Sequence, residues 1–586
     1  MPRELVSCIL FVFLSPALDA LHQRVEGDDR RALSPAAETW RQERRIIDLH
    51  MHVDASAEAI DRALPVMDAV GIGLGVNLGL GTVTRKGDEP SDFERNKALF
   101  DAHAPGRFVH YMLLDYEGWD QADWSERAVA QVEEGYRLGA AGLKEFKRLG
   151  LYLRDGAGKL IRIDDPKLDP VWQRCGELGL PVSIHVADPK AFWAPYDASN
   201  ERWEELADHP NWWFGDREKY PPREELLAAC NRVVERHPET TFVCVHFANN
   251  AEDIVEVGRW LERYPNMMAD IAARIPELGR HPPQLVHEVF TKHAHRILFG
   301  TDFMSYDRYT LGSGGKGPAP TLQDAIDFFR KSWRWFETDD RGFAHMTPIQ
   351  GRWTIDAIRL PDEVLRFIYF DNATRLLARS LPPPVARAKR IKQDFPLRAD
   401  HPAWQEAPPL RLEYAALDAT ARPEMSTEVR LLWTQESLYL RFVCPYTLLT
   451  VFSPPKAGER EGLWERDVVE AFVGAHPARP GCYLEFEVAP NGEQLDLAID
   501  IPHKDLAWSS GFTSKVEVDA AAQRWTAVLR VPLVAFAVPA PEPGTRWRMN
   551  LFRRDCANQA SLAWRTVLRP TFHTPERFGI LEFGTP

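Results

Sequence analysis

The sequence predicts an α/β chain in which a (β/α)8 TIM-type barrel is followed by an all-β sandwich. Along the first two thirds, short apolar stretches alternate with amphipathic helical patterns eight times, and eight such units close into a parallel barrel. No GxGxxG motif follows the first strand, so an open Rossmann sheet is the weaker alternative. After about residue 395, short strands follow one another without helices, which is typical of a sandwich.

The elements of the first region are predicted from this alternation in chain order. Strands are predicted at 46–52, 71–79, 107–115, 140–146, 181–185, 241–246, 266–273 and 296–302. Helices are predicted at 124–138, 168–179, 223–236, 252–264, 283–293 and 361–378. We therefore expect the barrel over residues 45–380, followed by a linker at 381–395 that begins at a run of three prolines.

The last region, residues 396–586, is predicted to form the sandwich. Its strands are expected at 428–433, 438–443, 468–473, 483–488, 494–499, 525–531 and 546–552. The Asn491-Gly492 pair between two of these strands is a strong hairpin signal, because both residues tolerate positive φ.

The length and charge of the chain limit the classes of function. A chain of 586 residues needs more than one hydrophobic core. Its net charge of −14 argues against nucleic acid or an anionic membrane as the main partner. A small-molecule substrate is expected instead, and a homo-oligomer remains open.

The amino terminus resembles a secretory signal. An apolar run at 5–14 is followed by small residues that would allow cleavage after about Ala20. We therefore expect a signal peptide at 1–20, a linker at 21–44 and export to the periplasm or the extracellular space. The alternative is an apolar leader on a cytoplasmic protein. The run is too short to span a bilayer, and no other segment predicts an integral membrane span.

Four of the eight predicted strands end in side chains that bind metals. His50 and His52 lie at i and i+2 of the first strand, so both can face one cation. Strands five, six and eight end in His185, His246 and Asp302. A parallel barrel gathers these strand ends at one mouth, and the set therefore predicts a metal site there.

The ligand types indicate the metal and its chemistry. Imidazole and carboxylate suit Zn²⁺, with Mn²⁺ or Fe²⁺ as alternatives, and His50, His52, His185 and Asp302 would supply four ligands. Such a metal activates water and polarises a carbonyl. Asp302 could accept a proton, and His246 could act as a general acid/base or as an electrophile.

Two long insertions leave the ends of metal-bearing strands, at 187–222 and from 302 to about 352. They should cover the mouth and shape a substrate pocket. In the first insertion, Trp193 and Tyr196 would either contact substrate or form a small core within the loop. Arg274, close to Glu277 and Arg280, would either bind a substrate carboxylate or belong to a surface ion-pair set.

These residues resemble the amidohydrolase superfamily, in its amidohydrolase-2 branch. The resemblance covers roughly residues 45–380. It rests on the following segments: His50-Met51-His52, His185, His246, Gly300-Thr301-Asp302 and Asp371-Asn372-Ala373-Thr374-Arg375-Leu376-Leu377. The resemblance implies a distorted barrel with one divalent metal, commonly zinc. It also implies that His50, His52, His185 and Asp302 are ligands and that His246 is catalytic.

Lys144 adds an alternative to this single-metal site. Binuclear members of the superfamily carry a carboxylated lysine at the end of strand four, where Lys144 stands. The alternative, which we favour, is that Lys144 binds an anion or forms a salt bridge.

The reaction itself stays open. The leading hypothesis is hydrolysis of a lactone, ester or amide by metal-activated water, on a substrate that could be sugar-derived. The alternative is a decarboxylase or hydratase of a small carboxylated substrate. A third hypothesis is a non-catalytic carbohydrate-binding protein, and the intact ligand set argues against it.

Residues 396–586 are similar to carbohydrate-binding modules of family 9. Three segments carry the resemblance: Leu463-Trp464-Glu465-Arg466-Asp467-Val468-Val469-Glu470, Tyr483-Leu484-Glu485-Phe486-Glu487 and Phe572-His573-Thr574-Pro575-Glu576-Arg577-Phe578-Gly579. The resemblance implies a carbohydrate partner and a bound calcium ion. A structural or docking role is the alternative.

Overall fold

A computed structural model describes residues 33–585 of the chain. The predicted signal peptide lies outside these residues. The chain divides into two compact units between Phe370 and Asp371, and each unit is described by itself. Among the described residues, no helix has the length and apolar character that crossing a membrane requires.

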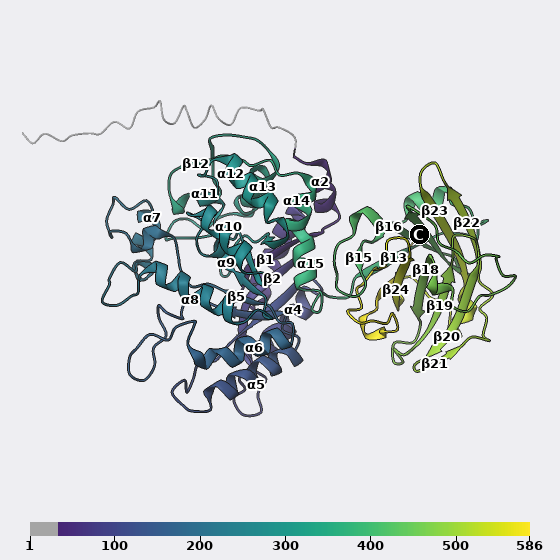
Figure 1. The fold of residues 1–586 in the computed structure, drawn as a ribbon, viewed down its shortest axis with the longest axis horizontal. Helices are drawn as coiled ribbons and strands as arrows, with labels where there is room; N and C mark the ends of the chain where they lie inside the picture. The colour runs from purple at the N-terminus through teal and green to yellow at the C-terminus, as the bar shows by residue number, and fades with distance from the viewer. Residues whose placement is uncertain (1–32, 586) are drawn as a thin grey trace, which may run out of the picture. The chain divides into compact units, whose positions relative to one another are not determined.

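The first unit is the predicted parallel barrel (Figure 1). Its strands run in sequence order around the sheet: β1 (Ile46–Val53), β2 (Ile72–Thr82), β3 (Phe108–Leu113), β4 (Gly142–Glu145), β5 (Val182–Ile184), β6 (Phe242–Cys244), β7 (Met267–Asp270) and β8 (Ile297–Leu298). The ring closes where β9 (Phe303–Ser305) pairs in parallel with β1, and where Leu49 N–H donates to the Phe299 carbonyl at 2.9 Å. The fold predicted for this region is thus confirmed.

Helices alternate with these strands. They are α2 (Pro35–Gln42), α3 (Ala57–Val70), α4 (Asp92–His103), α5 (Trp124–Arg137), α6 (Asp169–Glu177), α7 (Trp203–Asp208), α8 (Arg223–Arg236), α9 (Val245–Ala248), α10 (Ile254–Arg263), α11 (Ile275–Leu278), α12 (Pro283–Lys292), α13 (Leu322–Glu337) and α14 (Asp362–Arg366). Local chemistry sets their ends. Ser91 and Glu94 form a capping box at the start of α4, and Gly71 ends α3 at φ +80°, where a side chain would collide with Arg41.

Six of the eight barrel strands end earlier than predicted, and in two of them the difference concerns candidate site residues. β6 stops at Cys244 and β8 at Leu298, so His246 and Asp302 stand in irregular backbone beyond them. Both residues have positive φ, 56° for His246 and 61° for Asp302, which a regular strand does not allow. Three further short strands complete the first unit: β10 (Tyr309–Leu311), β11 (Phe343–Ala344) and β12 (Thr354–Ile355).

The second unit is the predicted β-rich domain. After α15 (Asn372–Leu376) it contains β13 (Val385–Arg390), β14 (Leu410–Leu412), β15 (Tyr414–Ala415), β16 (Thr427–Trp433), β17 (Ser437–Pro445), β18 (Val468–Gly474), β19 (Cys482–Val488), β20 (Gln494–Asp500), β21 (His503–Asp505), β22 (Thr513–Asp519), β23 (Arg524–Pro532), β24 (Arg546–Asp555), β25 (Ala560–Ala563) and β26 (Gly579–Phe583). Two curved layers, β21-β20-β19-β18-β24-β26 and β16-β17-β23-β22, enclose a core that includes Trp433, Phe442, Phe486 and Leu551.

The predicted linker contains a strand that joins these two layers. β13 pairs in parallel with β26 on one side and with β16 on the other. Ala386 and Ala388 alternate with exposed neighbours and are completely buried in the core. The structure therefore differs from the linker predicted at 381–395, because alternate side chains of β13 point into the core.

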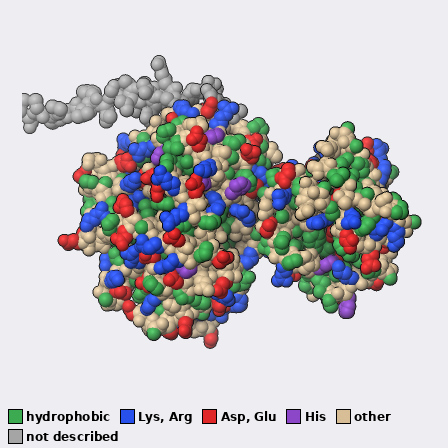
Figure 2. All heavy atoms as spheres, viewed as in Figure 1, with side chains coloured by type: hydrophobic (Ala, Val, Ile, Leu, Met, Phe, Trp, Pro, Cys, Tyr) green, Lys and Arg blue, Asp and Glu red, His purple; other side chains and the backbone are tan. Residues whose placement is uncertain are grey.

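Charged side chains are mixed over the surface. On the face shown in Figure 2, Lys and Arg side chains are interspersed with Asp and Glu over the described part of both units. The net charge of −14 is thus spread over the chain, at least on this face.

Candidate metal centre

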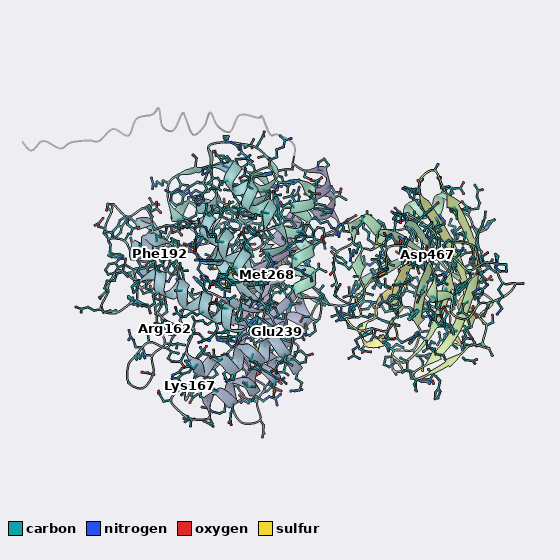
Figure 3. The ribbon with its side chains drawn as sticks, viewed as in Figure 1. Arg162, Lys167, Phe192, Glu239, Met268 and Asp467 are labelled. Atoms are coloured by element: carbon teal, nitrogen blue, oxygen red, sulfur yellow. The ribbon has the colours of Figure 1, made fainter. Side chains whose placement is uncertain are left out.

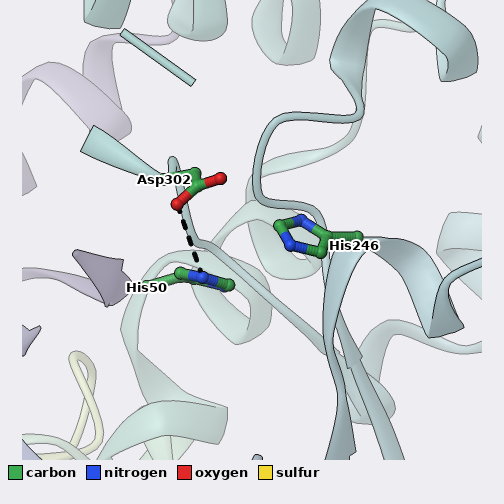
Figure 4. Close-up of side chains that lie close together, drawn as sticks. All are labelled: His50, His246 and Asp302. Carbon is green, nitrogen blue, oxygen red and sulfur yellow. Dashed lines mark ion pairs between the residues drawn. The ribbon is translucent and has the colours of Figure 1, made fainter. Parts of the chain in front are cut away.

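His50, His52 and Asp302 converge at the mouth of the barrel. Figure 4 shows His50 and Asp302 together with His246. The two histidines are on β1, and Asp302 is fixed to the same strand because its N–H donates to the His50 carbonyl at 2.8 Å. Oδ1 of Asp302 lies 3.5 Å from Nε2 of His50 and 3.4 Å from Nε2 of His52. One carboxylate oxygen therefore faces the same nitrogen of both imidazoles.

Hydrogen bonds behind these imidazoles fix their orientation. Nδ1 of His52 lies 3.0 Å from the Leu78 carbonyl, and Nδ1 of His246 lies 2.8 Å from the Ala272 carbonyl. A carbonyl only accepts, so both Nδ1 atoms carry the proton and both Nε2 lone pairs remain for a ligand. Nδ1 of His50 is held at 2.9 Å by Oδ2 of Asp270. This is the outer-shell arrangement that metal-binding histidines use, so the donor set fits a metal.

His246 occupies a strained position that Asp270 supports. The backbone N–H of His246 donates to Oδ1 of Asp270 at 2.9 Å, while the residue has a left-handed backbone. Left-handed backbone at a residue other than glycine costs about 1–3 kcal/mol and is concentrated at functional sites. Asp270 thus holds both His50 and His246.

Three of these buried residues form a group that could hold a metal ion. One ligand atom each from His50, His246 and Asp302 lies within 4.8 Å of the others. His185 is adjacent, with its ring centroid 4.4 Å from that of His246, but its Nε2 faces Oδ1 of Asp188 at 3.2 Å. The structure therefore brings all five predicted residues together, with His246 in the central group and His185 beside it.

Burial sets the protonation of the site. Desolvation lowers the pKa of His185 to about 4, and it lowers the pKa values of His52 and His246 well below the ordinary value. These histidines are neutral at pH 7, which is the state that binds a metal. Burial raises the pKa of Asp302, and the nearby cations partly oppose this rise because they favour the charged carboxylate.

Lys144 lies at the base of the same site. It is fully buried, and its Nζ has no hydrogen-bond partner among the described residues. Its ammonium group lies 5.4 Å from the centre of the Phe146 ring, and desolvation lowers its pKa to about 8. Among the described residues Lys144 has no salt-bridge partner, which leaves anion binding as the other half of the role that we favoured.

A cavity of about 620 Å³ is lined by the candidate metal ligands His50, His52, His185, His246 and Asp302. Tyr152, Phe192 and Trp212 line it from one side, and residues 312–315 of the second insertion line it from another. Phe192, labelled in Figure 3, comes from the insertion after β5. Both insertions therefore shape this cavity, as the sequence predicts.

The three tentative substrate contacts differ in their placement. Arg274 lines the cavity, and one of its Nη atoms donates to the Ala273 carbonyl at 2.9 Å. Trp193 and Tyr196 are not among the residues that line it. Their indole N–H and hydroxyl groups donate to the carbonyls of Pro221 and Leu206, at 3.0 and 3.1 Å. The structure therefore favours the loop core over substrate contact for both aromatic residues.

Sequence reasoning missed Asp270, Asp188 and Lys147. Asp270 ends β7, and a carboxylate at the end of a barrel strand could have identified it as a candidate site residue. Asp188 stands three residues after His185 and accepts from Nζ of Lys147 at 2.5 Å. Lys147 in turn lies 4.8 Å from the centre of the Trp212 ring. Nothing in the sequence marked Lys147, because the fold of the insertion decides its surroundings.

A comparison with protein families identifies the family of the first unit. The profile of the amidohydrolase family matches residues 42–379, more than half of the chain. A protein from Arthroderma benhamiae described as "Extracellular protein" is 30% identical over 180 residues, which cover 28% of this chain and 80% of that protein.

Two solved structures are each similar to part of the chain. The 2,6-dihydroxybenzoate decarboxylase from Rhizobium is 17% identical with a TM-score of 0.33, over 57% of this chain and 98% of that one. A family 9 carbohydrate-binding module from Caldicellulosiruptor kristjanssonii, solved with cellotriose, is 13% identical with a TM-score of 0.27, over 35% of this chain and 95% of that one.

Proposed function

The chain belongs to the amidohydrolase family, and from that premise we propose that its barrel is a metal-dependent hydrolase of a small lactone, ester or amide. One observation carries this proposal. The Nε2 atoms of His52 and His246 are left free by carbonyl acceptors at Nδ1, and Nε2 of His50 and His52 both face one oxygen of Asp302. A divalent metal at such donors supplies a Lewis acid and an activated water.

The proposed ligands are His50, His52, His185 and Asp302, and zinc is the proposed metal, with manganese or iron as alternatives. In this assignment, His246 takes or gives a proton at Nε2, because the Ala272 carbonyl holds its Nδ1 proton. A second assignment makes His246 the fourth ligand. The 4.8 Å grouping of His246 with His50 and Asp302 supports it, as does the contact of His185 with Asp188.

Cationic side chains around the cavity support a substrate that carries an anionic group. Lys147, Arg148, Arg274 and Arg308 all line it. A guanidinium binds a carboxylate through paired hydrogen bonds, so Arg274 is the proposed anchor for a substrate carboxylate. The same cations favour the alternative reaction, decarboxylation or hydration of a small carboxylated substrate at the same metal.

The first experiment is the metal content of the purified protein beside a His50→Ala/His52→Ala variant. We expect about one equivalent of zinc or manganese in the wild type and almost none in the variant. The matched control is His103→Ala/His503→Ala, since both of these histidines are exposed, and it should keep the metal. Two equivalents would make Lys144 a ligand of a second metal. No metal, even after reconstitution, would contradict the proposal.

Metal content of single variants then separates the two assignments of the fourth ligand. If His185 is the ligand, His185→Ala loses metal while His246→Ala keeps metal and loses activity. The opposite pattern supports His246 as the ligand. Product analysis separates the two reactions, because a lyase acting on a carboxylated aromatic releases carbon dioxide, whereas a hydrolase acting on a lactone releases a new acid.

For the second unit we propose a carbohydrate partner, and for the whole chain export from the cell. The extracellular relative supports export. Retention of the protein on insoluble polysaccharide, compared with a protein of similar charge, tests the first proposal. Cell fractionation followed by sequencing of the mature amino terminus tests the second, and an intact Met1 would contradict cleavage after Ala20.

A further inference from the structure

Two cysteines of the barrel lie in contact between the sheet and its outer helices. Cys230 is in α8, and Cys244 is the last residue of β6, the next strand along the chain. Their Sγ atoms are 3.8 Å apart, which is close to van der Waals contact of two sulfur atoms. Their side chains are 4% and 1% exposed. The two thiols therefore face each other in a space that is closed to solvent.

The patterns of both elements direct these side chains toward each other. On α8, Cys230 belongs to the buried face of an amphipathic helix. On β6, Phe242 and Cys244 share a face, and the Phe242 ring lies 6.4 Å from that of Trp172 in the outer helix α6. Cys244 thus points toward the surrounding helices. No other pair of cysteines is in contact among the described residues.

The pair lies beside the strained segment that carries His246. Residues 246–249, which directly follow Val245, all have left-handed backbone, with φ of 56°, 53°, 53° and 55°. Such backbone persists only where the surrounding structure holds it in place. Arg223, the first residue of α8, already holds the far end of this segment, because its Nη2 donates to the Asn249 carbonyl at 2.6 Å. A link between Cys230 and Cys244 would fix the near end to the same helix.

Burial limits when these thiols can react. The contact with Cys230 and desolvation raise the pKa of Cys244 well above its ordinary value, so almost no thiolate exists there at pH 7. A thiolate is the attacking species in thiol–disulfide exchange. A bond between the two cysteines would therefore form while the chain folds, before α8 covers β6.

We propose that Cys230 and Cys244 form a disulfide in the exported protein. Both S–H bonds break and one S–S bond forms between the Sγ atoms. Two electrons and two protons pass to an oxidant that is itself a disulfide, of a protein or of a small thiol, and that is released as two thiols. Through rotation about the Cα–Cβ bonds, the Sγ atoms approach from 3.8 Å to the bonding distance of about 2.05 Å. The inference rests on the export proposed above, because disulfides persist in oxidising compartments.

The compartment in which the chain folds tests the bond. Residues 21–586 are produced in a bacterial host, once behind a periplasmic leader of that host and once in its reducing cytosol. Each protein is unfolded without reductant, alkylated with iodoacetamide and digested for mass spectrometry. The periplasmic protein should give one pair of cross-linked peptides that contains Cys230 and Cys244, whereas Cys175 and Cys444 should be alkylated in both proteins. Alkylation of Cys230 and Cys244 in a periplasmic protein that is folded by circular dichroism would overturn the proposal.

Urea unfolding with and without dithiothreitol measures what the bond contributes. The reductant should lower the urea midpoint of the periplasmic protein by about 1 M, because a disulfide restricts the unfolded chain. Cys230→Ala/Cys244→Ala should show no such shift. Cys175→Ala is the matched control at a buried cysteine that contacts no other described cysteine, and it should keep the shift. An equal shift in both variants would assign the effect to another bond and contradict the pairing.

The full-length chain, with its own first 20 residues, separates this inference from the export proposal. Cleavage after Ala20 together with the bond between Cys230 and Cys244 would support both. An intact Met1 with reduced thiols would contradict export alone, since the bond formed behind the host leader would stand. A cleaved and folded protein in which Cys230 and Cys244 are alkylated would contradict the bond alone.

Discussion

The mouth of the barrel and a group of three glutamates on β18 and β19 of the second unit are both buried clusters of candidate metal ligands, and they are built in opposite ways. In the barrel, a protein hydrogen bond holds Nδ1 of each of His50, His52 and His246. In the second unit, the carboxylates of Glu470, Glu485 and Glu487 leave four oxygen atoms without a partner among the described residues.

This difference shows what each cluster needs from a cation. The candidate barrel ligands are oriented by hydrogen bonds within the protein, which suits a site that must also place a substrate accurately. The three glutamates carry like charges, and only a bound cation or shared protons can relieve their repulsion. The first arrangement is typical of catalysis, and the second is typical of a stabilising ion, such as the calcium ion that the resemblance of the second unit implies.

The largest expected effect is at the shared carboxylate of the barrel. Asp302→Asn keeps the size of the side chain but removes the charge that faces His50 and His52. We expect the rate constant for turnover to fall about a thousandfold and the metal content to fall with it. Zinc content and steady-state kinetics measure this. Asp307→Asn, at an exposed acid on the rim of the same cavity, is the control. An unchanged zinc content in Asp302→Asn would contradict its place among the proposed ligands.

The next largest expected effect comes from a residue that orients the proposed metal ligands. Asp270 does not belong to the proposed ligand set, but it holds Nδ1 of His50 and the backbone of His246. Asp270→Asn should weaken zinc binding about 10- to 100-fold, because outer-shell partners of metal ligands typically contribute that much. Competition with a chelator measures the affinity. An unchanged affinity, equal to that of the exposed control Asp101→Asn, would mean that the barrel ligands need no support from Asp270.

The sequence predicted the positions of the barrel ligands better than their supports. Strand ends locate His50, His52 and Asp302, since the chemistry of parallel barrels lies at that mouth. The role of Asp270 depends on the register of β7 against its neighbours. The orientation of Trp193 depends on the fold of the loop around it. Local sequence patterns determine neither the register nor this orientation. The burial of Glu470, Glu485 and Glu487 could not be predicted for a similar reason. The alternation of β19 predicts one face for Glu485 and Glu487, but not that loops bury that face.

Acid should destabilise the barrel through His110. This β3 residue is 2% exposed, and burial lowers its pKa from 6.5 to about 3. Below pH 6.5 the unfolded chain binds a proton that the folded chain does not, so the contribution of His110 to stability is complete above pH 6.5 and is lost as the pH falls. Between pH 7 and pH 5 this loss is about 2 kcal/mol. Urea unfolding at both pH values should show at least this loss, because the pKa values of His52, His185 and His246 are lowered as well. His110→Leu should reduce the loss by about 2 kcal/mol, whereas the exposed control His103→Leu should leave it unchanged.

The glutamate group should respond to pH in the opposite direction. Burial raises the pKa values of Glu485 and, to a greater extent, Glu487 and Glu470 above the ordinary 4.5. The folded state then holds protons that the unfolded state releases, so without Ca²⁺ the free energy of unfolding falls as the pH rises above 4.5. The slope is at most about 1.4 kcal/mol per pH unit and per group.

Urea unfolding in a calcium chelator, repeated with CaCl₂, measures this slope. Ca²⁺ should flatten it, and Glu487→Gln should reduce it without Ca²⁺, while Glu465→Gln, at an exposed glutamate, should match the wild type. A stability that rises with pH in the chelator, and does so equally in the wild type and Glu487→Gln, would show that the three carboxylates are not a source of strain.

The smallest expected effect separates the loop core from the cavity wall. Trp193 and Trp212 belong to the same insertion, but only Trp212 lines the cavity, where its ring stacks on His209 with centroids 4.0 Å apart. Trp193→Phe keeps an aromatic ring against Phe214 but removes part of the indole together with its hydrogen bond to the Pro221 carbonyl. It should lower the free energy of unfolding by about 1 kcal/mol and leave KM unchanged. Trp212→Ala should raise KM, since it removes part of the wall that a substrate would contact. Equal increases of KM in both variants would indicate that Trp193 contacts the substrate and that the insertion moves when substrate binds.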